Sequence, residues 1–106
     1  MDKIENSLQQ LINDILSSEI YRQYDVQRIR VNAMPELKSR IDEFRRRNLE
    51  LQMNEHTTIA EIDGFEREYA KFREDPIVDD FLAAELAFCR LMQEINLRLT
   101  DAMHFE

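Results

Sequence analysis

The chain has 106 residues, enough for one small domain with a modest core. Asp and Glu outnumber Lys and Arg by 22 to 14, and the resulting net charge of -8 repels phosphate, which argues against direct binding of nucleic acid. One glycine, two prolines and 34% charged residues are typical of long helices, not of sheets or barrels. We therefore expect a single all-α domain over residues 1–106.

The expected cellular location depends on features that the sequence lacks. The single cysteine excludes an intrachain disulfide and fits a reducing compartment. No apolar run approaches the ~18 residues of a membrane span. The N-terminus, with Asp2 and Glu5, lacks the basic-then-apolar order of a signal peptide. We expect a cytoplasmic protein that makes no membrane contact.

The first third of the chain predicts two helices. Asp2 and Glu5 form a capping-box pattern, and an apolar stripe then continues to about Ser17. The stripe comprises Ile4, Leu8, Leu11, Ile12, Ile15 and Leu16. Ser18 is the expected cap of a second helix from Glu19 to about Asn32, and the two helices are either separate or one kinked rod.

The middle of the chain predicts two further helices. Pro35 begins the third, because the residue before a proline avoids the α region. Its seam is narrow and contains a polar residue: Leu37, Ile41, Phe44, Asn48 and Leu51. Thr58 and Glu61 form a capping box for a fourth helix, which continues until Asp75-Pro76. Short connections favour antiparallel neighbours, so we expect a hairpin-rich array of four to five helices.

A long C-terminal helix organises the rest. Asp75 as cap and Pro76 at the first position predict a helix that reaches Met103 without an internal break. Its apolar face covers an arc of roughly 180°, although one neighbouring helix needs only a narrow seam. We therefore expect a homo-oligomer, a dimer or higher. The candidate core or oligomer residues are Phe81, Leu82, Glu85, Phe88, Met92, Ile95 and Asn96.

Two of these candidates, Glu85 and Asn96, are polar residues inside the apolar stripe. A buried carboxylate is tolerable only if a cation reaches it, and the candidates are Arg40, Arg45 and Arg47. Such residues can specify a packing arrangement. A catalytic role for Glu85 would need a second carboxylate or a histidine nearby and a pocket, and the sequence supplies neither recognisably.

The basic residues are concentrated in one segment. From Arg22 through Arg47 eight basic residues face four acidic ones, a net +4, so the remaining residues total -12. The triple arginine Arg45, Arg46 and Arg47 could dock an acidic partner, and Arg46 points away from the seam as the free one. The alternative is a solvated face with intrahelical pairs such as Asp42 with Arg45 or Arg46. No aromatic residue interleaves the run to stack on RNA bases.

Cofactor chemistry has no recognisable motif. His56, His104 and Cys89 lack the spacing of a zinc site, which needs about four ligands. The single glycine, Gly64, lies inside a helical segment and forms no phosphate-binding loop. We expect no enzyme activity, no metal and no cofactor.

Several segments resemble the YlbF/YmcA family of small bacterial proteins. They are Ser18–Tyr24, Pro35–Arg45, Leu51-Gln52, Asp75–Glu85 and Leu91–Asn96. The resemblance implies an all-helical, self-associating regulator without catalytic activity. It further implies relatives that act in complexes supporting competence, sporulation and biofilm development, partly by directing an endoribonuclease that processes messenger RNA.

The chain departs from the best-known members of that family in one respect. It lacks their cysteine-bearing C-terminal tail, since it stops at Glu106 and holds only Cys89. Their iron–sulfur clusters are therefore not expected here. Two functions remain: a regulator or adaptor that binds protein partners, and a purely structural, self-assembling helical protein.

Overall fold

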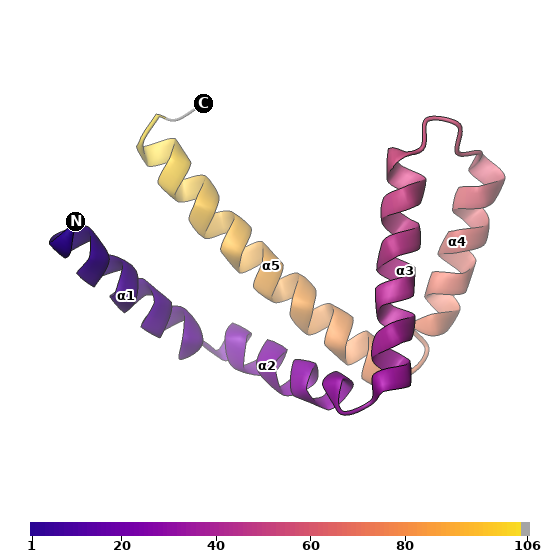
Figure 1. The fold of residues 1–106 in the computed structure, drawn as a ribbon, viewed down its shortest axis with the longest axis horizontal. Coiled ribbons are helices and arrows are strands. Elements are labelled where there is room, and N and C mark those ends of the chain that lie inside the picture. Colours follow the sequence, from indigo (N-terminus) through magenta and orange to yellow (C-terminus); the bar gives the residue numbers. More distant parts are fainter. Residues whose placement is uncertain (105–106) are drawn as a thin grey trace.

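The computed structural model describes residues 1–104, and these residues are all-helical (Figure 1). The described helices are α1 (Asp2–Leu16), α2 (Glu19–Asn32), α3 (Pro35–Met53), α4 (Ile59–Phe72) and α5 (Pro76–Ala102). Residues 1–104 contain no strand. The predicted all-α class and the long C-terminal helix are confirmed.

Three predicted helix caps are confirmed by side-chain hydrogen bonds. The side-chain oxygens of Ser18, Thr58 and Asp75 accept from the backbone N–H groups of Tyr21 at 3.2 Å, Glu61 at 3.1 Å and Ile77 at 3.0 Å. Each bond satisfies an N–H that the first turn leaves without an intrahelical acceptor. Because Ser18 is extended, with φ -72° and ψ 150°, α1 and α2 are separate helices.

The predicted cap at Asp2 is wrong. Met1 occupies the N-cap position of α1, and no side chain caps this helix. The carbonyl of Met1 accepts from the N–H of Glu5 at 2.7 Å, so the helix begins one residue earlier than the capping-box pattern indicates. Asp2 and Glu5 instead lie in the first turn, where negative charge stabilises the positive end of the helix dipole.

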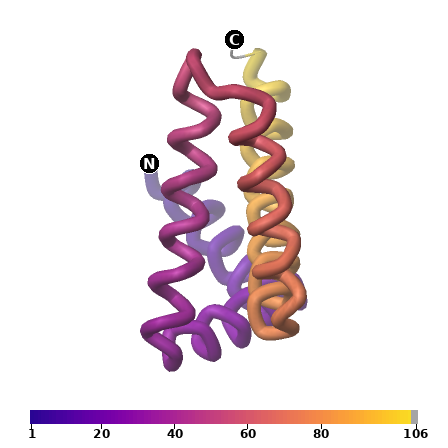
Figure 2. The backbone as a smooth tube through the Cα atoms, turned by 90° about the vertical axis from the view of Figure 1, so that its right-hand side faces the viewer, coloured from indigo at the N-terminus to yellow at the C-terminus, as the bar shows by residue number. Residues whose placement is uncertain are grey.

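The helices diverge from a common base. α5 packs along α2, while α3 and α4 lie side by side and are joined at the far end by residues 54–58 (Figures 1 and 2). The molecule measures 52 × 36 × 17 Å, and its radius of gyration is 17.7 Å. A compact domain of this size has a radius of gyration of about 13 Å. The described chain is therefore elongated, and much of each helix lies outside a shared core.

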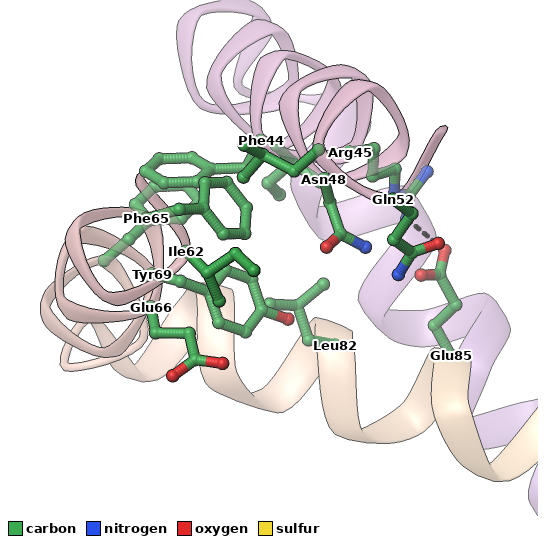
Figure 3. A pocket seen from close by; sticks show the side chains of 13 residues that line it. Phe44, Arg45, Asn48, Gln52, Ile62, Phe65, Glu66, Tyr69, Leu82 and Glu85 are labelled. Atoms are coloured by element: carbon green, nitrogen blue, oxygen red, sulfur yellow. Dashed lines mark hydrogen bonds and ion pairs between the residues drawn. The ribbon is translucent and has the colours of Figure 1, made fainter. Parts of the chain in front are cut away.

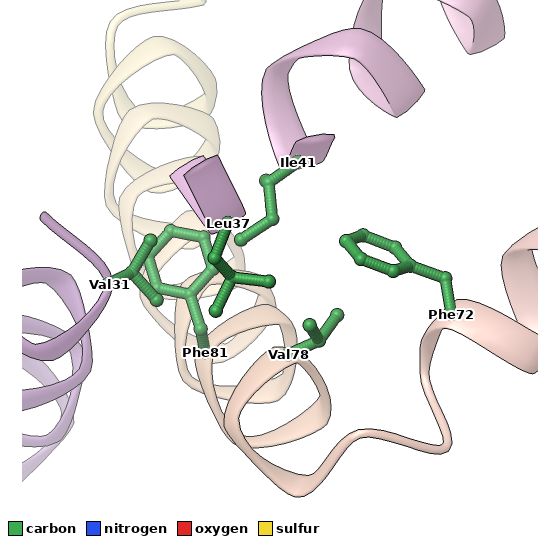
Figure 4. Close-up of a cluster of buried hydrophobic side chains, with 6 residues drawn as sticks. All are labelled: Val31, Leu37, Ile41, Phe72, Val78 and Phe81. Atoms are coloured by element: carbon green, nitrogen blue, oxygen red, sulfur yellow. The ribbon is translucent and has the colours of Figure 1, made fainter. Parts of the chain in front are cut away.

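The core lies at the base. It contains Val31, Leu37, Ile41, Phe72, Val78 and Phe81, contributed by α2, α3, α4 and α5 (Figure 4). Val31 and Val78 are essentially inaccessible to solvent. Because this cluster holds the ends of four helices together, it sets the directions in which their remaining turns project.

Candidate functional site

The face predicted on α5 is packed near the base and open farther along the helix. Phe81 is buried, and Leu82, Glu85, Phe88 and Ile95 are half-buried. Met92 and Asn96 are exposed. Asn96 is exposed within one chain because α5 extends beyond the helices that pack on it, so its role in packing or oligomer formation stays a prediction.

The helix that covers α5 is α2. The ring of Phe88 stacks on Tyr24 with 5.0 Å between centroids and 10° between planes, and Tyr21 meets Phe88 edge-on at 5.4 Å. Tyr24 also approaches the buried Phe81 at 6.4 Å. α2 therefore supplies one packing partner for the broad face of α5.

Near its beginning α5 also packs against α3, whereas apolar side chains farther along α5 stay exposed within the described residues. No residue of α1 is buried, although this helix is strongly amphipathic. We use the name open faces for the exposed apolar residues on the stripe of α1 and on the apolar side of the C-terminal half of α5 with its C-cap: Ile4, Leu8, Ile12, Leu16, Met92, Leu99 and Met103. Soluble monomers rarely leave contiguous apolar surface of this kind uncovered.

Arg46 is not a free cation. Its guanidinium is paired with two carboxylates of its own helix, those of Glu43 and Glu50, and its Nε donates to Glu43 at 3.1 Å. This hydrogen bond raises the pKa of Arg46 and lowers the pKa of Glu43 below its ordinary value. The prediction that Arg46 is free is therefore wrong, because residues three and four positions away share its exposed face.

Arg45 is the cation that pairs with Glu85, as one of the three arginines expected from the sequence. The two side chains form an ion pair between α3 and α5, and the Glu85 side chain is 26% exposed. The Arg45 guanidinium also lies 5.5 Å from the ring centroid of Phe81. Arg45 also forms an ion pair with Asp42, with 3.9 Å between Nη1 and Oδ1, and this is the intrahelical pair that the solvated-face interpretation predicted.

Arg47 points in a third direction. It pairs with Glu68 of α4 at 2.6 Å and lies over the rings of Phe44 at 5.4 Å and Phe65 at 5.3 Å. The three adjacent arginines thus bind carboxylates on three different helices. Docking of an acidic partner on Arg45, Arg46 and Arg47 stays a prediction, but these cations already have acidic neighbours.

A groove of about 460 Å³ lies between α3, α4 and the beginning of α5 (Figure 3). Its lining is mainly apolar and aromatic, with a few polar side chains: Ile41, Phe44, Leu51, Ile62, Phe65, Tyr69, Phe72 and Leu82 beside Arg45, Asn48, Gln52, Glu66 and Glu85. Sequence reasoning missed this groove. The feature of the sequence that could have indicated the groove is Asn48, a polar residue in the apolar seam of α3. Asn48 is exposed and lies in the groove.

The wall of the groove is an aromatic cluster. Phe44 stacks on Phe72 with 4.6 Å between centroids, and Phe65 stacks on Tyr69 at 6.0 Å. Arg40 covers Phe72 at 4.6 Å, and Arg47 covers two other rings of the cluster. Rings held on several sides are fixed in place, so the groove is largely preformed.

Residues 1–104 offer neither a metal-binding cluster nor a membrane-spanning helix. This part of the chain has no cluster of three or more His, Cys, Asp or Glu residues placed to hold a metal ion. None of its helices is long and apolar enough to cross a membrane. Cys89 is exposed and unpaired within these residues.

These features define a class: an elongated, all-helical protein with exposed apolar helix faces and a preformed groove. Residues 4–104 match the family model described as control of competence regulator ComK, YlbF/YmcA. The chain belongs to this regulatory family, as the resemblance of its sequence segments predicted. Neither a curated protein nor a solved structure matches the chain.

Proposed function

We propose that the protein is a non-catalytic cytoplasmic regulator that acts as a homo-oligomer and binds other proteins. Membership of a family described by control of the competence regulator ComK supports a regulatory role. The candidate pathways are those that the family resemblance implies: competence, sporulation, biofilm development and messenger RNA processing. The observation that carries the proposal is the exposure of the open faces on α1 and α5.

A second copy of the chain is the occupant proposed for the open faces. Two chains bring together two copies of α1 and two of α5, which is enough for a four-helix arrangement with antiparallel neighbours. A two-fold axis would place the same residues on both sides of the interface. The basic segment Arg22–Arg47, in a chain of net charge -8, provides a complementary charge for association.

Light scattering at micromolar concentration tests the assembly. The wild type should have at least twice the 12.8 kDa mass of one chain. Leu99→Glu, at a residue 52% exposed, should reduce this mass while circular dichroism still shows a folded helical chain, with helicity lost only from α1. Leu49→Glu on α3, where the residue is 56% exposed, is the matched control and should keep the wild-type mass. A wild type that stays monomeric would rule out the proposed oligomer.

The open faces equally support the second function, a purely structural self-assembling protein. The two functions differ in what else binds. Purification of the tagged wild type from its native cell should recover defined regulatory proteins in addition to further copies of the chain. Recovery of the chain alone at low salt would favour the structural function.

A further inference from the structure

We propose that the groove between α3 and α4 binds an amphipathic α-helix of a protein partner, with apolar residues inserted between the two helices and basic residues beside α4. This inference rests on the proposed function, because it assumes action through protein partners. It concerns a different surface from the open faces and specifies the chemistry of the partner.

The length of the groove fits a helix. Its lining residues extend from Ile41 to Gln52 on α3 and from Ile62 to Phe72 on α4. At 1.5 Å per residue each wall is about 15 Å long, or roughly three helical turns. Helix-binding grooves of this length accept apolar anchors at positions i, i+3 or i+4, and i+7.

The position of α5 leaves room for another helix. Leu82 and Glu85 of α5 close the base of the groove (Figure 3). Beyond the base α5 diverges from the α3–α4 pair, so it does not continue along their inner side (Figure 1). A partner helix on this side would pack against α3 and α4 as a third helix.

The groove also offers polar groups at its edge. The amides of Asn48 and Gln52 point into it (Figure 3), and within residues 1–104 neither donates or accepts a side-chain hydrogen bond. These amides can bind polar side chains that flank the apolar anchors of a helix. The aromatic rings of Phe44, Phe65 and Tyr69 supply the apolar contact area.

Charge indicates that the partner helix is basic. Arg45 is neutralised by Glu85, whereas Glu66, also in the groove, has no ion-pair partner within residues 1–104. α4 as a whole contains four acidic residues against two basic ones. A second copy of α1 is a poor fit, since that helix has three acidic residues and one lysine. Complementary charge favours a helix with Lys or Arg along the edge that faces α4.

The test uses a labelled synthetic helix of about 14 residues built from Leu and Lys in an amphipathic pattern. Fluorescence anisotropy should show saturable binding to the wild type, about tenfold tighter or more than binding of the same pattern built from Leu and Glu. Ile62→Lys, at a residue 39% exposed, should weaken binding by at least about tenfold. Glu66→Lys should weaken it at low salt.

Ile59→Lys is the matched control, because Ile59 lies on the same helix, is 79% exposed and does not line the groove. It should bind the Leu/Lys helix as the wild type does. Equal weakening by both isoleucine variants, or no weakening by either, would overturn the groove as the binding site. A change in the mass of the free protein caused by Ile62→Lys would assign the groove to a second copy and also overturn the proposal. If Ile62→Lys loses peptide binding but keeps the wild-type mass, the groove is disrupted while the oligomer is intact. The groove and the proposed oligomer are therefore tested separately.

Discussion

Phe88 of α5 stacks on Tyr24 of α2, with ring centroids 5.0 Å apart and ring planes within 10°. This pair joins two helices that are separated in the sequence by the whole of α3 and α4. Since Phe88 lies two turns beyond the buried Phe81, it extends the contact of α5 with α2 beyond the core.

The two phenylalanines should differ in their contributions to stability. Phe81→Ala removes a core ring and should lower the free energy of unfolding by about 3 to 5 kcal/mol. Phe88→Ala removes a half-buried ring and its stacking, and should lower it by roughly 2 kcal/mol. Urea denaturation followed by circular dichroism measures both. A loss below about 1 kcal/mol for Phe81 would contradict its place in the core.

The Arg45–Glu85 pair should contribute little to stability despite linking two helices. The side chains are 46% and 26% exposed, so water screens the attraction. A double-mutant cycle with Arg45→Ala and Glu85→Ala should give a coupling energy of about 0.5 to 1 kcal/mol. The cycle for Arg46 and Glu50, which pair within α3, is the control and should give about 0.3 to 0.5 kcal/mol. A coupling above about 3 kcal/mol would mean that the pair is effectively buried.

Gly64 is a site where substitution should stabilise the protein. It lies inside α4, and a Cβ added there would meet none of the neighbouring side chains of residues 1–104 within 4 Å. Gly64→Ala should raise the free energy of unfolding by about 0.5 to 1 kcal/mol, because alanine has less backbone entropy to lose in a helix. Thermal and urea unfolding measure the change. A destabilised variant would show that α4 has a close neighbour at this position in the assembled protein.

The pKa of Glu43 should depend on Arg46. The hydrogen bond from the arginine lowers this pKa in the folded chain. The stabilisation from the pair is therefore present above the ordinary glutamate pKa and is lost as the pH falls through the lowered value. Arg46→Gln should raise the pKa of Glu43 in an NMR titration, whereas Arg22→Gln on α2 should leave it unchanged. An unchanged pKa in Arg46→Gln would disprove the pairing.

Local features of the fold were predictable from the sequence, whereas contacts between helices were less so. Ser18, Thr58 and Asp75 were identified as caps because a cap depends on hydrogen bonds within a few residues. The arginine partner of Glu85 was one of three candidates, since a pair 40 positions apart depends on how helices cross. The direction of Arg46, away from the apolar seam, was predictable, but that same direction brings it beside Glu43 and Glu50, which makes it a paired cation.

The groove could not be predicted for a related reason. Its width depends on the separation of α3 and α4, which the ring contacts of Phe44 with Phe65 and Phe72 maintain. A sequence pattern assigns these rings to apolar faces but gives no distance between the faces. The family, by contrast, was identified from segments spread along most of the chain, and the match over residues 4–104 confirmed it.

The lack of any buried residue in α1 has a thermodynamic consequence. Isolated helices of about 12 to 15 residues are only marginally stable in water, and α1 has 15 residues. The rest of the chain therefore contributes little free energy to the formation of helix α1. A surface that covers the apolar stripe of α1 must also supply the free energy that orders this helix. Amide hydrogen exchange along α1 should accordingly be rapid in dilute protein and should become slower as the stripe is covered. The ordering of α1 from coil to helix is therefore a direct measure of association.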